Sequence, residues 1–310
     1  MRIKNGGVPL RPHAIAETLR KSQSSTAEVA AAVRAMHQRE RVRIIEDPYA
    51  KFLCGRFWQL VLRIRPLEWF IRGVLRPIAP ASMCVLMRAR YAEQTLETAI
   101  EASITQYVII GAGMDSFAFR RPDLMDRIDV FEIDHPVTQQ KKLEYIRRAG
   151  LSVPPRLHFV PTDLSRISAL DALAGSGFEI SQPTFLTLLG VAYYITADSL
   201  TETARSISQH LPAGTLLVID YLLDEESAKF EHLPMRSRMK SFVARRGELM
   251  VSEYSLAAMN DLMAAQDFET VENFALPHLE QQYKEELGTL PFEVPSIFAF
   301  GTFRVASRDA

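Results

Sequence analysis

The pattern of apolar and polar positions changes character near residue 100. Before that point apolar residues recur at helical spacing, first over 26–43 and again over 83–102. Ser24-Ser25-Thr26 offers N-cap chemistry, which predicts that the first of these helices begins there. Prolines at 66, 77 and 80 divide the stretch between them into short helices. The first third of the chain is therefore predicted to be helical.

Beyond residue 100, short apolar runs alternate with helical segments. This alternation predicts a doubly wound, mostly parallel α/β sheet of Rossmann-like type. We expect an N-terminal helical cap over 1–100 and a core over 101–310, with an inserted helical lid at about 224–253, all in one structural unit. The strands are expected at 106–110, 128–133, 157–160, 184–189, 216–220 and 296–304, with helices at 198–210 and 255–266 among those between them.

Composition places the chain among ordinary soluble enzymes, with 47% hydrophobic and 24% charged residues in 310. Its two cysteines, Cys54 and Cys84, argue against a disulfide framework, and without a nearby histidine pair they argue against a zinc site. Residues 1–14 contain no apolar signal core. We expect a cytoplasmic protein with no metal.

Charge is distributed unevenly along the chain. Residues 1–90 contain 17 Lys/Arg and 6 Asp/Glu, whereas the remainder contains 19 and 31. A basic lobe suits nucleic acid, anionic lipid or an acidic ligand. Because the net charge is only −1 and no nucleic-acid motif appears, we favour a basic lobe resting on the acidic remainder, with no nucleic-acid partner.

The most apolar segment is Phe57–Pro77, which four arginines and a glutamate interrupt. These charges leave too few consecutive apolar residues for a membrane span, so no integral membrane segment is expected. The segment could lie on a membrane surface or cap a substrate pocket through Trp58, Leu60, Trp69, Phe70 and Val74. We favour the cap, because the arginines are interspersed and not confined to one face.

Candidate ligand-binding residues follow the predicted strands. Gly111-Ala-Gly113 follows the first strand, where paired glycines allow a tight turn and close backbone approach to a ligand. Asp134 lies 21 residues beyond Gly113, near the spacing typical of a carboxylate that binds a ribose diol. Asp163 follows the third strand. Together these residues predict a nucleoside-containing cofactor.

The same loop distinguishes between cofactors. Ser116 stands where a dinucleotide fingerprint would have its third glycine, and Asp115 places a carboxylate in the turn. A carboxylate there would repel a diphosphate and suits a cationic ligand. The loop therefore favours S-adenosylmethionine, whose sulfonium is positive, over NAD.

Several motifs together resemble the leucine carboxyl methyltransferase family. They cover roughly residues 24–304, and they comprise Gly-Ala-Gly-Met-Asp-Ser-Phe-Ala-Phe-Arg120, Phe131-Glu-Ile-Asp-His-Pro136 with Lys141 or Lys142, Thr162-Asp-Leu164, Gly190-Val-Ala-Tyr-Tyr194, and upstream Thr26-Ala, Ala32-Val-Arg34 and Asp47-Pro-Tyr-Ala50.

The resemblance implies a seven-stranded sheet with an antiparallel last strand, and it implies roles for individual residues. The glycine turn of Gly111 and Gly113 would face the methionine part of S-adenosyl-L-methionine, and Asp134 would face the ribose. The remaining implied cofactor contacts are Asp163 and Leu164 at adenine, Arg88 (with Arg90 as the alternative) at the cofactor carboxylate, and Arg34 as a second basic partner.

One position departs from the family. Leu189 stands just before Gly190, where members often have a glutamate beside the cofactor. This replacement moves the chain away from the member that esterifies a phosphatase C-terminus and toward the branch that methylates small molecules.

No catalytic base stands out. His135, Tyr193, Tyr194 and Tyr221 follow strands and are weak candidates. Methyl transfer from an activated sulfonium requires mainly alignment and exclusion of water.

We therefore expect an S-adenosylmethionine-dependent O-methyltransferase acting on a hydroxyl or carboxyl of a small, apolar or aromatic molecule, in secondary metabolism. Protein C-terminal carboxyl methylation, a non-catalytic cofactor-binding module and, more remotely, an NAD dehydrogenase are the alternatives. The sequence leaves the oligomeric state open.

Overall fold

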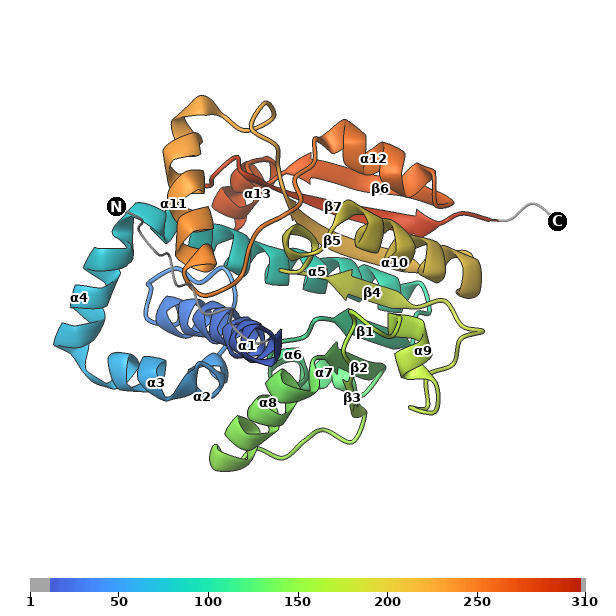
Figure 1. Ribbon diagram of the computed structural model, residues 1–310, viewed down its shortest axis with the longest axis horizontal. Coiled ribbons are helices and arrows are strands. Elements are labelled where there is room, and N and C mark those ends of the chain that lie inside the picture. Colours follow the sequence, from blue (N-terminus) through green and yellow to red (C-terminus); the bar gives the residue numbers. More distant parts are fainter. Residues whose placement is uncertain (1–11, 308–310) are drawn as a thin grey trace, which may run out of the picture.

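A seven-stranded sheet with helices on both faces forms the centre of the molecule, which confirms the expected Rossmann-like α/β class (Figure 1). The computed structural model describes residues 12–307, with side chains described from residue 25 onward. The strand order is β3-β2-β1-β4-β5-β7-β6, and β7 alone runs antiparallel to its neighbours. The strands are β1 (Gln106–Ile110), β2 (Asp129–Asp134), β3 (Leu157–Pro161), β4 (Phe185–Leu188), β5 (Leu216–Leu222), β6 (Phe268–Ala275) and β7 (Phe298–Val305).

The order of winding reverses between β1 and β4, which pair at the middle of the sheet. All five residues of β1 are buried, because strands flank it on both edges and helices cover both faces. Loops that leave the carboxyl ends of β1 and β4 must diverge toward opposite sides, and this opens a crevice where ligands bind in such sheets. The fold thus places the Gly111 turn at the expected site.

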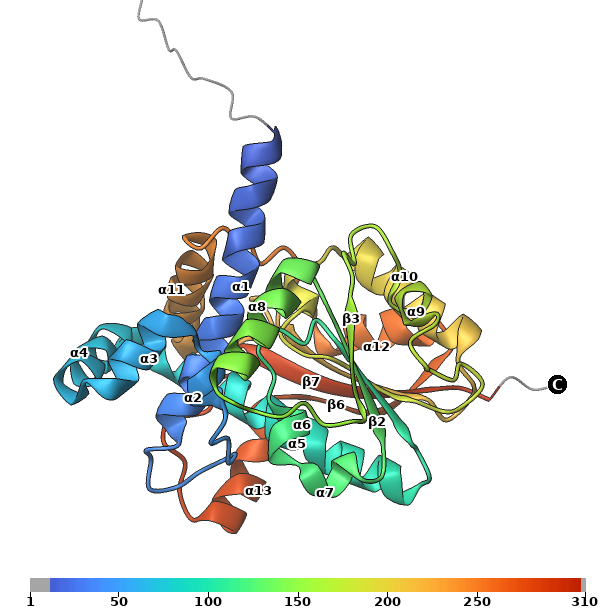
Figure 2. The ribbon, with the colours of Figure 1, turned by 90° about the horizontal axis from the view of Figure 1, so that it is seen from below.

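Helices lie on both sides of the sheet (Figure 2), and alternate residues of the strands enter two separate cores, one on each face. Tyr107 and Ile109 join the first core, and Val108 and Ile110 join the second. The first core is covered by α5 (Ser82–Glu101), α6 (Phe117–Arg120), α7 (Pro122–Met125), α8 (Pro136–Arg148) and α13 (His278–Leu287), and the second by α9 (Ala169–Leu173), α10 (Ala197–His210) and α12 (Leu256–Ala264).

Two further helical segments lie outside the sheet. The first is the N-terminal cap, and the second is the lid between β5 and α12, whose helix packs against the cap. The cap comprises α1 (Pro12–His37), α2 (Ala50–Leu53), α3 (Gly55–Arg63), α4 (Arg65–Leu75) and the short 3-10 helix η1 (Arg76–Ala81), and the lid comprises η3 (Phe230–His232) and α11 (Leu233–Ala244).

Two predictions about elements were wrong. The first helix begins at Pro12 and runs through Ser24-Ser25-Thr26, because no proline or glycine interrupts the residues after Pro12. Most of residues 1–14, read as lacking a signal core, lie outside the described residues. Strand β6 was not recognised because it is an edge strand, and edge strands contain polar residues that weaken the apolar signal.

The segment Phe57–Pro77 does contribute to the cavity wall, through Arg72, Leu75 and Arg76, but the apolar residues expected to do so do not. Of the five apolar residues assigned to it, only Trp58 is buried, and none lines the cavity described below. Leu60, Trp69, Phe70 and Val74 face solvent instead, because the opposite sides of α3 and α4 are the ones that pack on the molecule.

Candidate cofactor and acceptor site

The turn after β1 requires its first glycine. Gly111 has φ +75°, and a Cβ there would lie 2.5 Å from Cγ2 of Val191 in the turn after β4. The backbone N–H groups of Gly111 and Ala112 both donate to the carbonyl of Ile133, at 2.8 and 3.1 Å, which ties the turn to β2. Gly113 has φ +53°, also in the left-handed region. The two turns therefore approach each other so closely that only glycine fits at position 111, and Gly111 and Val191 both line the cavity.

Asp134, at the end of β2, binds the backbone of the same glycine turn. Its Oδ2 accepts the N–H of Gly113, and its Oδ1 accepts the N–H of His135 at 2.6 Å. Burial raises the pKa of this carboxyl, although the two backbone donors oppose the shift. Each carboxylate oxygen retains a lone pair, and the side chain lines the cavity, as binding of a ribose diol requires.

Asp163 and Leu164 line the cavity beyond the end of β3. Asp163 Oδ1 accepts hydrogen bonds from the Ser165 hydroxyl at 2.6 Å and from the Ser165 backbone at 3.2 Å. The Ser165 hydroxyl is the main cause of the lowered pKa of Asp163. Asp163 Oδ2 lies 3.4 Å from Arg166 Nε and can accept a further hydrogen bond, and the half-exposed Leu164 side chain provides an apolar wall. This pair suits a purine with an exocyclic amine.

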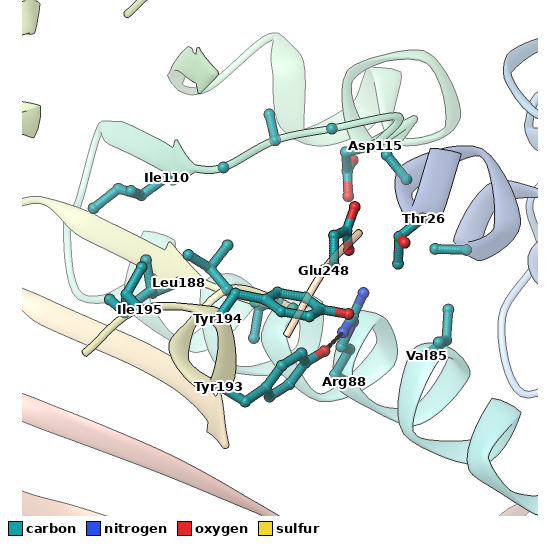
Figure 3. Close-up of a pocket in the computed structure, with 18 of the residues that line it drawn as sticks. Thr26, Val85, Arg88, Ile110, Asp115, Leu188, Tyr193, Tyr194, Ile195 and Glu248 are labelled. Carbon is teal, nitrogen blue, oxygen red and sulfur yellow. Dashed lines mark hydrogen bonds between the residues drawn. The ribbon is translucent and has the colours of Figure 1, made fainter. Parts of the chain in front are cut away.

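Arg88 reaches the cavity from α5 and contacts Tyr193 (Figure 3), and Asp220 holds it there. Its Nη1 donates to Asp220 Oδ2 and to the Tyr193 hydroxyl, both at 3.1 Å. Burial alone would lower the pKa of Arg88, but Asp220 raises it above its ordinary value, so the guanidinium remains charged. Arg90, the alternative, points elsewhere: it pairs with Glu286 and does not line the cavity.

Arg34 joins the cap to the glycine turn. Its Nε donates to Asp47 at 2.8 Å, and its Nη2 donates to the carbonyl of Met114 at 2.5 Å. Asp47 is fully buried and also accepts from the Ser116 hydroxyl at 2.6 Å. Arg34 lines the cavity, but two of its donors are committed to holding the loop.

Asp115 caps the short helix α6, as its Oδ1 accepts the N–H of Phe117 at 2.6 Å. Burial alone would raise the pKa of Asp115, but Arg120, Arg34 and Lys142 together lower it. The loop therefore presents a carboxylate that is ionised near neutral pH. This charge suits a sulfonium and opposes a diphosphate.

The four candidates for a catalytic base do not fill that role well. His135 begins α8, and its Nδ1 accepts the N–H of Val137 at 3.3 Å. Tyr193 and Tyr194 line the cavity, but burial raises the pKa of both phenols far above neutral. Tyr221 does not belong to the site, because its side chain points away from the cavity and its hydroxyl donates to Asn273 Oδ1 at 2.6 Å.

Glu248, in the lid, is the group that sequence reasoning missed. It is buried at the cavity wall, close enough to the Thr26 and Tyr194 hydroxyls for both to affect its pKa (Figure 3). Even so, no hydrogen bond of normal geometry involves its Oε1 or the Thr26 hydroxyl among the described residues. Burial raises the pKa of Glu248 to about 7, although the two nearby hydroxyls and Arg246 oppose the shift. A lone glutamate in a charged segment gives no sequence signal, because only the fold brings the lid over the strand ends.

Of the site residues expected from the sequence, all except Arg90 and Tyr221 line one cavity of about 1640 Å³, and so does Glu248. This volume exceeds the roughly 300–1,000 Å³ of a site for a single small ligand. Leu189, at the unusual position, also lines it. The cap and the lid supply mostly apolar side chains, among them Val33, Val85, Met239, Phe242, Val243 and Met250.

The residues present fit S-adenosylmethionine. A side chain at Gly111 would clash with Val191, Asp134 offers two carboxylate oxygens bonded to the same turn, and Arg88 supplies a permanent cation for a carboxylate. The fold and the site together define a class, the S-adenosylmethionine-dependent methyltransferases.

Comparison with known proteins identifies the family. The profile described as Leucine carboxyl methyltransferase matches residues 27–208, more than half of the chain. The chain therefore belongs to the leucine carboxyl methyltransferase family.

Relatives of the chain are described as candidate S-adenosyl-L-methionine-dependent methyltransferases. YktD of Bacillus subtilis (strain 168) is 36% identical over 204 residues, which cover 64% of this chain and 62% of that protein. A relative from Mycobacterium ulcerans (strain Agy99) is 26% identical over 264 residues, 81% of each chain. A crystal structure of a candidate methyltransferase from Thermobifida fusca YX shares the fold at 15% identity, with a TM-score of 0.60 over 97% of this chain and 100% of that one.

Proposed function

We propose that this chain transfers the methyl group of S-adenosylmethionine to an oxygen of a small, largely apolar organic molecule, and that the oxygen belongs to a hydroxyl. The observation that carries the proposal is Glu248, a buried carboxylate without a partner for its Oε1, in a cavity large enough for a cofactor and an acceptor.

Separate parts of the cavity suit the two molecules. Gly111, Asp134 and Asp163 would hold the nucleoside and the chain that joins it to the amino acid, and Arg88 would hold the amino-acid carboxylate. When bound, the cofactor supplies a methyl group already activated on a sulfonium. Lid and cap would enclose the acceptor among apolar side chains and exclude water, which raises the rate by fixing the reacting atoms in line.

Glu248 would orient the acceptor and take its proton. Its ionised Oε1 would accept the hydrogen bond of the acceptor O–H. As the bond between that oxygen and the methyl carbon forms and the methyl–sulfur bond breaks, the proton would pass to Glu248 Oε1 and then to solvent. A general base is most effective when its pKa lies near the working pH, and that of Glu248 is raised to about 7.

The same carboxylate disfavours an acid as the acceptor. A carboxylate acceptor needs no base, and an ionised Glu248 beside it would repel it. Arg88, one of the cavity-lining cations that could attract a carboxylate, is proposed to be occupied by the cofactor. A neutral hydroxyl, by contrast, supplies the donor that Glu248 Oε1 lacks.

The second candidate is methylation of a protein carboxyl, which the family's description favours. Leu189 argues against it, since the glutamate often found beside the cofactor in the family is absent here.

A two-part experiment tests the proposal. Calorimetry should show S-adenosylmethionine binding to the wild type and its loss in Asp134→Ala, with the far-ultraviolet circular dichroism of the variant unchanged. A tritiated-methyl assay should then label apolar phenols and alcohols in preference to the matching carboxylic acids. Binding of wild-type strength in Asp134→Ala would overturn the cofactor assignment. Label confined to base-labile protein esters would favour the protein-modifying alternative.

A further inference from the structure

The outer face of α3 and α4 presents six large apolar side chains to solvent. They are Phe57, Leu60, Ile64, Trp69, Phe70 and Val74, and the largest of them, Trp69, is 80% exposed. Phe57, Leu60 and Ile64 recur at a spacing of three and four residues, opposite the buried Trp58, Val61 and Leu62 of α3. In α4, Trp69, Phe70 and Val74 line one shallow hollow on the surface. Single exposed apolar residues are ordinary, but a contiguous set of this size marks an interaction surface.

Every exposed charged residue between positions 51 and 77 is positive. Lys51, Arg56, Arg63, Arg65 and Arg76 are exposed, and the only acidic residue between 51 and 77, Glu68, is buried. Glu68 pairs with Arg39 and Arg72 on the inner side, so it does not offset the outward charge. The outer face therefore combines apolar side chains with a cationic border.

Contacts on the inner side of α4 hold this helix in a fixed position against α1. Arg72 Nη2 donates to the carbonyl of Met36 at 2.8 Å, and its Nη1 pairs with Glu40 at 2.5 Å. Figures 1 and 2 both show α3 and α4 at the margin of the molecule, away from the sheet. The apolar side chains are thus presented outward by a braced element.

The helical stretch 65–101 is long and apolar enough to cross a membrane by length and composition. In the structure its second half is α5, which buries Met83, Leu86 and Met87 in the core, so this stretch cannot cross a bilayer without dismantling the fold. A second copy of the chain is a poor occupant of the outer face as well. A two-fold dimer through this face would bring together two surfaces whose exposed charges are all positive, so it would have no charge complementarity.

From these observations we propose that the outer face of α3 and α4 docks on an anionic lipid bilayer. Tryptophan and phenylalanine would enter the boundary between headgroups and acyl chains, and the bordering cations would contact lipid phosphates. Arg72, Leu75, Arg76 and Ile78, in α4 and η1, also line the cavity. Docking would therefore bring the wall of the cavity next to the lipid surface. This proposal does not depend on the identity of the methyl acceptor.

The chain contains two tryptophans, which makes fluorescence a direct test. A Trp58→Phe variant of the full chain leaves Trp69 as its sole reporter. Titration with phosphatidylcholine vesicles containing about one third phosphatidylglycerol should shift Trp69 emission to the blue, whereas pure phosphatidylcholine should not. The affinity should fall at high salt, because the electrostatic attraction to the headgroups is screened.

Co-sedimentation with the same vesicles tests the residues. Trp69→Ser with Phe70→Ser should abolish binding, and Arg63→Glu should weaken it at least about fivefold. Phe230→Ser and Arg147→Glu, exposed elsewhere, are the matched controls and should bind like the wild type. Equal binding to both kinds of vesicle, binding to neither, or a lipid-free dimer that Trp69→Ser with Phe70→Ser dissociates would overturn the proposal.

Discussion

Asp220 fixes Arg88 at the cavity wall by accepting a hydrogen bond from its Nη1 at 3.1 Å. The other oxygen of Asp220 accepts the N–H of Gly190 at 2.5 Å, so one fully buried carboxylate joins α5 to the turn after β4. The proposed grip on the cofactor carboxylate therefore depends on a residue that would not itself touch the cofactor.

Replacing Asp220 with asparagine should weaken both folding and cofactor binding. The buried guanidinium would lose its counter-charge, at a cost of about 3–5 kcal/mol in the free energy of unfolding. The affinity for S-adenosylmethionine should fall at least about tenfold as Arg88 loses its fixed position. Urea unfolding and calorimetry measure the two effects. Glu286→Gln, which breaks the half-exposed pair with Arg90, is the control and should cost at most about 1 kcal/mol.

Gly190→Ala should have the same effect on binding by a steric route. Gly190 has φ +76°, and a Cβ there would lie 2.7 Å from Arg88 Nη1. Backbone strain alone costs about 1–2 kcal/mol. Gly214→Ala, at φ +86° with no atom within 4 Å of the new Cβ, measures that strain alone. Only Gly190→Ala should reduce cofactor affinity. Equal affinities in the two variants would show that Arg88 does not need its observed place.

Asp47→Ala should release the cap from the glycine turn. The variant would leave Arg34 and the Ser116 hydroxyl, both buried, without their carboxylate. We expect a loss of about 3–5 kcal/mol in the free energy of unfolding and faster hydrogen exchange across 111–116. Asp123→Ala removes an exposed ion pair with Arg121 and should change neither quantity appreciably. Unchanged exchange in Asp47→Ala would mean that the turn keeps its shape without the cap.

The sheet could be predicted because buried parallel strands are continuous apolar runs. The expected runs 106–110 and 216–220 coincide with β1 and the start of β5. The placement of Gly111, Asp134 and Asp163 around one cavity followed from the fold rule that strand ends meet at one edge. These residues lie within a few positions of a strand, where sequence and position in the fold are tightly linked.

Groups that act across long sequence separations could not be predicted. Asp220 meets Arg88 from 132 residues away, and nothing local distinguishes it from an ordinary strand aspartate. Glu248 reaches the cavity only because the lid packs on the cap. The apolar residues of Phe57–Pro77 were expected to cap the pocket. That expectation failed because the helical period identifies an apolar side of a helix but does not say whether that side packs on the protein or faces solvent.

Glu248→Gln provides the pH-dependent prediction. Burial holds the pKa of Glu248 at about 7, above its ordinary 4.5, so the fold favours the protonated form. Below pH 4.5 this preference adds up to about 3 kcal/mol to the free energy of unfolding. That contribution is lost as the pH rises through 7. Glutamine mimics the protonated form, so the ligand-free variant should be more stable than the wild type at pH 8 and equally stable at pH 4.

Methyl transfer should change in the opposite sense: the wild-type rate rises through pH 7, whereas Glu248→Gln loses about 10²–10⁴-fold in kcat together with that pH dependence. Thermal unfolding and initial rates across this range measure both, and a rate profile identical to that of the wild type would remove Glu248 as the base.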